Sequence, residues 1–321
     1  MYKLGLMCLL LLIPACAPAE PTPLTPVIVQ LSFSHQAEFA GLYVADQLGY
    51  FASEGLAVTF REGGPQVNFI TPLVDGTAEF GVASPADVIL ARADGKLLKA
   101  IAVVYRRSPI VFFSHADSGI KRPQDFVGKT IRSTLTLDLT LRAMLQRENV
   151  RPDQYNIVYL PSDVSRFAAR DVPIWGGYLN VLVVDVQRAG YDINIIFPDD
   201  YGIHFFADVL ITRDELISKN PELVRRFLRA TLKGWKYAVE NPNAIPALVV
   251  QYNPNADRAL EEARMLASLP LVNTGKDQIG WIEPERWTGM ESTLRAQRVL
   301  TKTVNIADVF TTQFLQEIYT E

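Results

Sequence analysis

The sequence predicts an α/β protein that folds as two domains. From Val27 to Phe60 a β-rich run, a helical pattern and a second β-rich run follow one another, an order that implies two parallel strands joined by a right-handed crossover. A second series of the same kind begins near Lys121, and the run Val209–Thr212 is expected to return the chain to the first series. The chain has 321 residues, of which 49% are apolar, a length that is too great for one average domain but suits two.

The first series is expected to begin with a strand over Val27–Phe33. A helix follows over Ala37–Glu54, and Gly55 is placed to end it, as glycine often does. A second strand is expected over Leu56–Phe60 and a second helix over Val67–Asp75.

A helix start is indicated at Ser84–Asp87. Serine is a favoured N-cap residue, Pro85 suits the first helical position, and an acid at the third position completes a capping box. This segment follows a short buried strand, Phe80–Ala83. Two further strands are expected over Leu98–Tyr105 and Ile110–Ser114.

The second series is expected to contain one long helix and four short strands. The helix covers about Leu137–Asn149 and carries an apolar stripe at helical spacing. The strands are expected at Thr130–Ser133, Ile157–Leu160, Val172–Trp175 and Ile193–Phe197.

The last third of the sequence is predominantly helical. Asn-Pro pairs at Asn220, Asn241 and Asn253 each place a capping residue before a proline that suits the first helical turn. Between the first two pairs one helical face is repeatedly filled by apolar residues and includes Trp235, which is therefore expected in the core and not at a binding site. A final helix is expected over Ile306–Tyr319.

Residues 1–15 are predicted to be a secretory signal, because Lys3, an apolar run over Leu4–Ile13 and small residues occur in that order. The apolar run is well short of the roughly 20 residues of a spanning helix. Ile13–Cys16 resembles the bacterial lipobox, in which the cysteine becomes the acylated N-terminus; an ordinary signal with an incidental cysteine is the alternative. Residues 16–26, rich in proline and small side chains, are then expected to form an extended, lipid-anchored tether.

Composition and motifs argue against several function classes. The net charge of −4 argues against nucleic-acid binding, which needs a basic surface. Cys8 would leave with the signal and Cys16 would be acylated, so the mature chain would form neither a disulfide nor a thiolate metal site. The sequence contains no P-loop, no G-x-S-x-G, no H-E-x-x-H and no zinc-ligand spacing. We therefore expect no catalytic activity, no metal and no cofactor.

Four segments carry a family resemblance: Ser34–Phe60, Glu79–Ser84, Ile120–Ile131 and Trp175–Asn180. In this order they resemble solute-binding lipoproteins of ABC transporters related to the thiamine-pyrimidine synthase family and to sulfonate-binding proteins. The resemblance implies a type II periplasmic-binding-protein fold, with two α/β lobes, a hinge and a cleft between the lobes. The implied lobes are residues 27–112 with 206–321, and residues 113–205.

The resemblance also implies a function. A monomer anchored by its lipid to the extracytoplasmic face of the cell membrane would capture a small nutrient and deliver it to an ABC permease and its ATPase. Riboflavin is the first expected ligand, because Leu182 stands where pyrimidine-binding members carry an acid, and an apolar residue there suits a larger neutral ring. A thiamine pyrimidine precursor is the second, and an alkylsulfonate clamped by Arg106 and Arg107 is the third, although such a pair is more often solvated.

The sequence bears on two other function classes. The eukaryotic relatives that make the thiamine pyrimidine carry a cysteine-rich iron-binding motif, which a mature chain without a free cysteine cannot supply, so synthase activity is not expected. A surface lipoprotein that senses a ligand for a partner other than a transporter is the alternative of another class.

The first candidate ligand contacts are Trp175, Tyr178 and Asn180, because the two glycines between the aromatic residues let the backbone approach a ligand closely. Packing of Trp175 in a core is the alternative. Ser84 and Asp138 lie at helix starts, where capping alone also explains them.

The remaining candidates lie at junctions between elements. His35 is at a strand-to-helix junction and shares its turn with Glu38 and Phe39, whereas Tyr105 and Tyr201 lie beside the two expected crossings between lobes. Core packing is the alternative for both tyrosines. The full set of expected ligand contacts is His35, Phe39, Ser84, Tyr105, Asp138, Trp175, Tyr178, Asn180, Tyr201 and His204.

Overall fold

The computed structural model describes residues 23–64, 66–273, 275 and 278–320. The predicted secretory signal, Cys16 and residues 17–22 of the predicted tether lie outside the described residues. Among the helices in the described ranges, none combines the length and the apolar character needed to cross a bilayer.

The first of two sheets contains five strands in the order β2-β1-β3-β10-β4. Strand β1 pairs in parallel with β2 and β3, as the strand–helix–strand order predicts, and β10 runs antiparallel between β3 and β4. The strands are β1 (Thr25–Gln30), β2 (Leu56–Arg61), β3 (Phe80–Ala83), β4 (Leu98–Tyr105) and β10 (Ala207–Arg213). The predicted return of the chain to the first series is therefore confirmed.

The second sheet repeats this plan in the order β7-β6-β8-β5-β9. Strand β6 pairs in parallel with β7 and β8, and β5 runs antiparallel between β8 and β9. The strands are β5 (Ile110–His115), β6 (Thr130–Ser133), β7 (Asn156–Tyr159), β8 (Ile174–Tyr178) and β9 (Ile193–Ile196). In both sheets the antiparallel strand directly follows one of the two connections between the sheets, residues 106–109 and 197–206.

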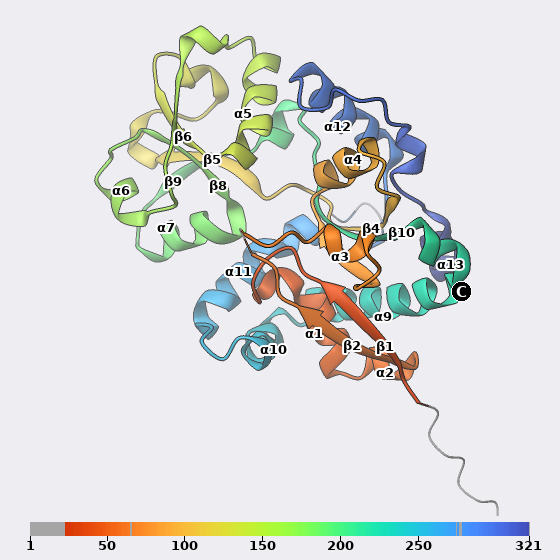
Figure 1. Ribbon diagram of the computed structural model, residues 1–321. Coiled ribbons are helices and arrows are strands. Elements are labelled where there is room, and N and C mark those ends of the chain that lie inside the picture. Colours follow the sequence, from red (N-terminus) through yellow and green to blue (C-terminus); the bar gives the residue numbers. More distant parts are fainter. Residues whose placement is uncertain (1–22, 65, 274, 276–277, 321) are drawn as a thin grey trace, which may run out of the picture.

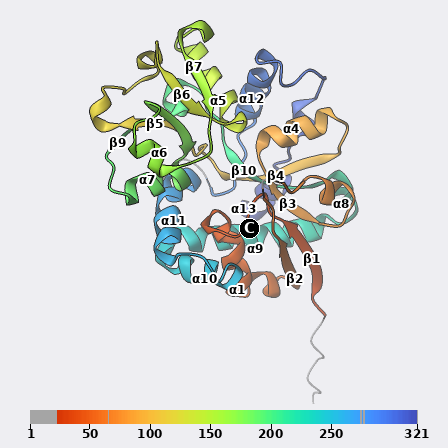
Figure 2. The ribbon, with the colours of Figure 1, turned by 60° about the vertical axis from the view of Figure 1, so that its left-hand side comes forward.

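Each sheet and its helices form one lobe, and the lobes lie side by side (Figures 1 and 2). The first lobe is the described part of residues 23–105 and 207–320, and the second lobe is residues 110–196. The helices of the first lobe are α1 (Ala40–Gln47), α2 (Tyr50–Ser53), α3 (Thr71–Val74), α4 (Pro85–Ala93), α8 (Asp214–Lys219), α9 (Pro221–Glu240), α10 (Ile245–Tyr252), α11 (Arg258–Val272), α12 (Pro284–Ala296) and α13 (Gln313–Thr320). Those of the second are α5 (Leu135–Arg147), α6 (Val164–Ala168) and α7 (Val184–Arg188), with a π-helical turn, η5 (Leu179–Val183).

Short 3₁₀ turns connect many of these elements. They are Ala37–Phe39, Ala116–Ser118, Pro123–Phe126, Pro152–Gln154, Pro198–Tyr201, Pro242–Ala244 and Ile306–Asp308.

Helices α1 and α9 cross at two glycines. A Cβ atom on Gly234 would lie 2.0 Å from the carbonyl oxygen of Gly41, and one on Gly41 would lie 2.2 Å from the ring of Trp235. The helix axes therefore approach more closely than any side chain would allow. Trp235 is 2% exposed, so its predicted place in the core is confirmed.

Several predicted elements have different bounds. The helix expected over residues 37–54 is divided into α1 and α2, because Gly49 adopts a positive φ of 72° between them. The helix expected over residues 67–75 shortens to α3, and the last helix begins at Gln313 instead of Ile306. The predicted cap is confirmed, since the amide of Asp87 donates to Ser84 Oγ at 3.2 Å.

The expected division between lobes needs correction at two places. The boundary expected between residues 112 and 113 falls inside β5, which pairs with β8 and β9 from Ile110 onward. The expected tether overlaps β1, because Thr25 and Pro26 already pair with Leu56 and Ala57. Main-chain pairing starts earlier than the apolar pattern indicated, since Thr25 and Pro26 pair through the backbone with β2 while their side chains stay at least partly exposed.

Candidate functional site

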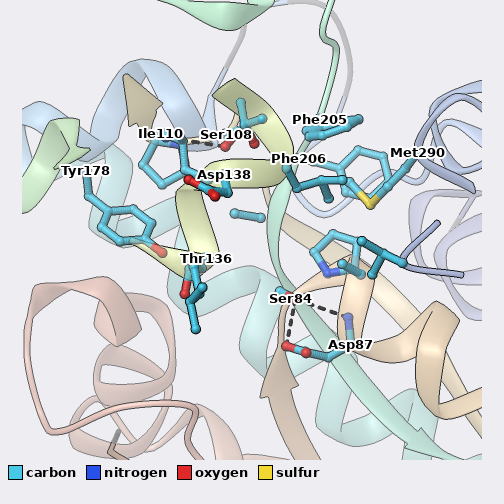
Figure 3. A pocket seen from close by; sticks show the side chains of 18 of the residues that line it. Ser84, Asp87, Ser108, Ile110, Thr136, Asp138, Tyr178, Phe205, Phe206 and Met290 are labelled. Atoms are coloured by element: carbon cyan, nitrogen blue, oxygen red, sulfur yellow. Dashed lines mark hydrogen bonds between the residues drawn. The ribbon is translucent and has the colours of Figure 1, made fainter. Parts of the chain in front are cut away.

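Loops of both lobes line a shared cleft of about 1740 Å³. Ser84 directly follows β3, Thr136 lies in the first turn of α5 after β6, and Tyr178 is the last residue of β8. The cleft therefore lies at the carboxyl ends of parallel strands. Figure 3 shows Tyr178 on one side of the cavity and Phe206 and Met290 on the other. The cleft is larger than a typical small-ligand pocket, as expected of one whose walls can close.

The first lobe contributes two facing carboxyl groups, Glu38 and Asp208. Gln36 Nε2 donates to Glu38 Oε2 at 2.5 Å, and Ser32 Oγ donates to Glu38 Oε1 at 3.5 Å. Desolvation raises the pKa of Asp208 well above its usual value, and the negative charge of Glu38 raises it further. Desolvation also raises the pKa of Glu38, but the hydrogen bond from Asp208 lowers that pKa again in part. Asp208 is therefore the member of the pair that keeps its proton.

Asp208→Asn is expected to raise Tm at neutral pH by a few degrees. Because the folded pKa of Asp208 lies above the unfolded value of about 3.9, stability falls as pH rises from that value through the folded pKa. Asparagine cannot ionise, can donate to Glu38, and tolerates the φ of 45° at this position. Tm followed by circular dichroism from pH 4 to 9 should vary less in the variant than in the parent.

The control for this prediction is Asp153→Asn. Asp153 is exposed, and its pKa is lowered by the hydrogen bond from Arg151, so its removal should not raise Tm at neutral pH. An unchanged or lower Tm of Asp208→Asn at pH 7 would contradict the conclusion that Asp208 is the protonated carboxyl whose raised pKa lowers stability at neutral pH.

The second lobe contributes the ring of Tyr178, which points into the cavity (Figure 3). The side chain is 36% exposed, and that exposure is to the cleft. Desolvation raises the pKa of its hydroxyl, and the charges of Glu38, Asp208 and Asp87 raise it further. Tyr178 therefore faces the carboxyl groups of the other lobe with its phenol protonated.

Ser84 and Asp138 also line the cleft, each within a hydrogen-bonded group of its own lobe. Ser84 Oγ donates to Asp87 Oδ2 at 2.6 Å, in the cap of α4. Asp138 accepts from Ser133 Oγ at 2.8 Å and from Tyr159 Oη at 2.5 Å. The cap of α4 accounts for the polarity of Ser84, whereas Asp138 is held by side chains of its own lobe and caps no helix. Both line the cleft and are within reach of a ligand.

Trp175 does not line the cleft, and the expectation that its ring faces a ligand is wrong. The ring is fully buried in the core of the second lobe, where Nε1 donates to the carbonyl of Val172 at 3.0 Å and the ring edge meets Phe167. Side chains alternate along a strand, so residues three apart in β8 point to opposite faces. Trp175 and Tyr178 therefore cannot both face the same cavity.

Leu182 likewise lies in the second-lobe core, 3% exposed and outside the cleft lining. The argument that this residue selects a larger ring is therefore wrong. The π-helical turn Leu179–Val183 directs Asn180 and Val181 to the cleft instead.

Five other expected contacts lie away from the cleft lining. His35 forms a 2.8 Å hydrogen bond with Tyr43 Oη. Burial lowers the pKa of His35, and the charge of Glu62 raises it by a smaller amount. Phe39 is 1% exposed and packs edge-on against Tyr43. Phe39 belongs to the core of the first lobe, and the half-buried ring of His35 packs beside it against Tyr43 and Tyr252.

The other three lie near the connections between the lobes. Tyr105 is buried one layer behind Asn180, Tyr201 packs against the core, and His204 is 58% exposed and pairs with Asp199 at 3.0 Å. Proximity to a crossing does not by itself bring a side chain into the cleft.

Arg106 and Arg107 are also absent from the cleft lining. Arg106 pairs with Glu283, and Arg107 pairs with Asp199 and Asp200 at 3.3 and 2.5 Å while lying over the ring of Phe197. Within the described ranges the two arginines that do line the cleft, Arg142 and Arg151, are paired with Asp138 and Asp153. The expected sulfonate clamp is therefore wrong.

Sequence reasoning missed several residues of the cleft. Asp208 is the second residue of β10, and Met290 lies in α12. Both belong to the first lobe, whereas Thr136 and Tyr178 belong to the second. The signal available for Asp208 was an acid at the second position of a largely apolar strand. Apolar residues such as Phe206 and Met290 carry no signal that distinguishes cleft from core.

The family model described as NMT1/THI5 like matches residues 36–245. The chain belongs to the NMT1/THI5-like family. Among its relatives it is 28% identical to the riboflavin-binding protein RibY of Chloroflexus aurantiacus, over 97% of this chain and 96% of that one. It is 27% identical to the formylaminopyrimidine-binding protein of Halalkalibacterium halodurans, over 91% of each chain. It is also 25% identical to a 4-amino-5-hydroxymethyl-2-methylpyrimidine phosphate synthase of Legionella pneumophila, over 86% of this chain and 88% of that one.

The fold of this family member is that of type II periplasmic binding proteins. The periplasmic aliphatic sulphonate binding protein SsuA from Escherichia coli superposes with a TM-score of 0.72 at 15% identity, over 88% of this chain and 91% of that one. A sulfonate-binding protein from Methylobacillus flagellatus gives the same TM-score at 14% identity, over 92% and 94%. The expected fold, with a cleft between two lobes, is thereby confirmed.

Proposed function

We propose that this chain is an extracytoplasmic solute-binding protein of an ABC importer and that its ligand is a flat heteroaromatic vitamin, riboflavin first. Similarity to RibY along 97% of the chain and the shared two-lobed fold support this function. Closure of the lobes over a ligand would let the permease and its ATPase distinguish loaded protein from empty protein.

The observation that carries the proposal is the composition of the cleft. Tyr178 offers an aromatic face, and Phe206 and Met290 form an apolar wall across from it. Glu38 and Asn180 add polar groups to the lining. Such a cavity, mostly apolar with a few convergent polar groups, suits a planar ring that carries hydrogen-bonding substituents.

A thiamine pyrimidine precursor is the second candidate. The carboxyl pair of Glu38 and Asp208 would accept hydrogen bonds from an exocyclic amine, and a relative named formylaminopyrimidine-binding protein matches 91% of the chain. Since Leu182 lies outside the cleft, preference for riboflavin now rests on the similarity along the whole chain and on the large cleft. An alkylsulfonate is third, because the carboxyl groups of Glu38, Asp87 and Asp138 line the cleft and oppose an anion.

We also propose that the protein is held to the membrane through acylated Cys16 and performs no reaction on its ligand. The lipobox-like segment supports the anchor, and the absence of any cysteine beyond Cys16 in the sequence supports a binding role despite the synthase relative. Membrane fractionation of a Cys16→Ser variant tests the anchor, and an unchanged membrane fraction would reject it. Ligand sensing without import stays the alternative, which uptake of the ligand by cells lacking the protein would favour.

Calorimetry of the purified mature protein with three ligands tests the proposed function. Riboflavin is expected to bind with a dissociation constant of about 1 µM or tighter, which corresponds to about −8 kcal/mol. 4-Amino-5-hydroxymethyl-2-methylpyrimidine and an alkanesulfonate are expected to bind at least tenfold more weakly. Binding of the aminopyrimidine without riboflavin would replace the first candidate by the second, and binding of the sulfonate alone would reject both.

A further inference from the structure

A buried hydrogen-bond group joins three elements behind the cleft. Asn180 lies in η5 of the second lobe, Ser268 in α11 and Tyr105 at the end of β4, directly before the first connection between lobes. Asn180 Nδ2 donates to Ser268 Oγ at 3.0 Å, and Tyr105 Oη donates to the same oxygen at 3.1 Å. Asn180 is 7% exposed and Ser268 1%, so the group is shielded from bulk water.

The direction of these hydrogen bonds fixes the amide of Asn180. Ser268 Oγ donates its proton to the carbonyl of Arg264 at 2.8 Å, so its lone pairs are left to accept from Tyr105 and Asn180. The amide of Asn180 must therefore present its nitrogen to Ser268. Because Asn180 lines the cleft while Ser268 and Tyr105 do not, the oxygen Oδ1 is the atom left for the cleft.

Acceptors also predominate on the facing wall. The Glu38 carboxylate and the Asp87 carboxylate line the cleft from the first lobe, and the nitrogen of Gln36 is already directed to Glu38. Arg142 and Arg151, which line the cleft from the second lobe, are directed to Asp138 and Asp153. A ligand that only accepts hydrogen bonds would leave these oxygens desolvated and unpaired, at a cost in affinity.

Building on the proposed function, we propose that Ser268 is a positioning residue that orients Asn180, so that the cleft selects its ligand by the N–H and O–H groups the ligand donates. Removing the hydroxyl of Ser268 frees the Asn180 amide to rotate and to present its nitrogen to the cleft. Ligands with donors facing Asn180 then lose affinity, whereas ligands without such donors do not.

The test compares Ser268→Ala with the parent, using riboflavin, 3-methylriboflavin, which lacks the ring N–H, and lumiflavin, which lacks the ribityl hydroxyls. Ser268→Ala is expected to weaken riboflavin binding by about three- to tenfold. It is expected to weaken binding by less than twofold for the analogue that lacks the donor group facing Asn180. The control is Thr231→Val, which removes another buried hydroxyl that donates to a helix carbonyl four residues earlier, away from the cleft. It is expected to leave all three affinities unchanged.

A second readout needs no ligand. In ¹⁵N NMR spectra the side-chain amide protons of Asn180, assigned by their loss in Asn180→Asp, should exchange slowly in the parent and in Thr231→Val, and rapidly in Ser268→Ala. Equal losses of affinity for all three flavins in Ser268→Ala would overturn the proposal. So would an exchange rate of the Asn180 amide protons that Ser268→Ala leaves unchanged. If the parent binds no flavin, the proposed function fails, and the amide exchange alone then supports or overturns the orientation of Asn180.

Discussion

Tyr178→Ala is expected to weaken riboflavin binding by about 10- to 100-fold. The ring is an aromatic surface that the second lobe presents to the cleft, and burial of such a side chain against a ligand contributes about 1.5–3 kcal/mol. Tyr178→Phe keeps that surface and should weaken binding by less than threefold. Quenching of riboflavin fluorescence at several protein concentrations measures all of these affinities.

The matched control for Tyr178 is Trp175→Phe, three residues earlier in the same strand. Because Trp175 packs inside the second lobe, this change should lower thermal stability and leave the riboflavin affinity of the folded protein unchanged. The reverse pattern, with affinity lost in Trp175→Phe and kept in Tyr178→Ala, would mean that the ligand binds elsewhere than in the cleft.

Gly234→Ala is expected to destabilise the protein by about 3 kcal/mol or more, because the added methyl group meets backbone that cannot easily move. The added carbon would lie 2.0 Å from the backbone oxygen of Gly41 and 3.0 Å from the amide nitrogen of Ala45, so α1 and α9 must separate. At roughly 2–4 °C for each kcal/mol, Tm should fall by about 6–12 °C. Thermal denaturation followed by circular dichroism checks this.

Gly289→Ala is the control, because Gly289 lies within α12 and a Cβ there would meet no atom within 4 Å. Alanine favours a helix interior over glycine, so this variant should be as stable as the parent or up to about 1 kcal/mol more stable. If Gly234→Ala has the same Tm as Gly289→Ala, α1 and α9 do not cross as closely as described.

Local sequence patterns were sufficient for much of the fold. Phe80–Ala83, Leu98–Tyr105 and Thr130–Ser133 were expected with the bounds that the strands have, since apolar runs between turn residues mark buried strands. The cap at Ser84 was predictable because its chemistry involves only neighbouring residues. The break at Gly49 was not, since the helical spacing of apolar residues continues across it.

The candidate site was predictable only in part, because it depends on contacts between distant segments. Tyr178, Asn180, Ser84 and Asp138 lie where a loop after a strand opens on the cleft, and that position can be read from a sequence. The pairing of Glu38 with Asp208 joins residues 170 positions apart, one in the turn after β1 and the other in β10, and no local pattern indicates it. The burial of Trp175 depends on which face of β8 meets the cleft, and a one-residue shift would reverse it.

The position of β10 in the first sheet determines the order in which the fold can be completed during synthesis. Within the part of the chain that the structure describes, strand β4 has no sheet neighbour except β10, and its isolated bridges at Ala100 and Val103 reach Phe310 and Gly280, which come later still. The second sheet, by contrast, uses only residues between Ile110 and Ile196. The lobe made from the middle of the chain can therefore mature while the lobe that begins the chain waits, with an unpaired strand, for residues that emerge a hundred positions later.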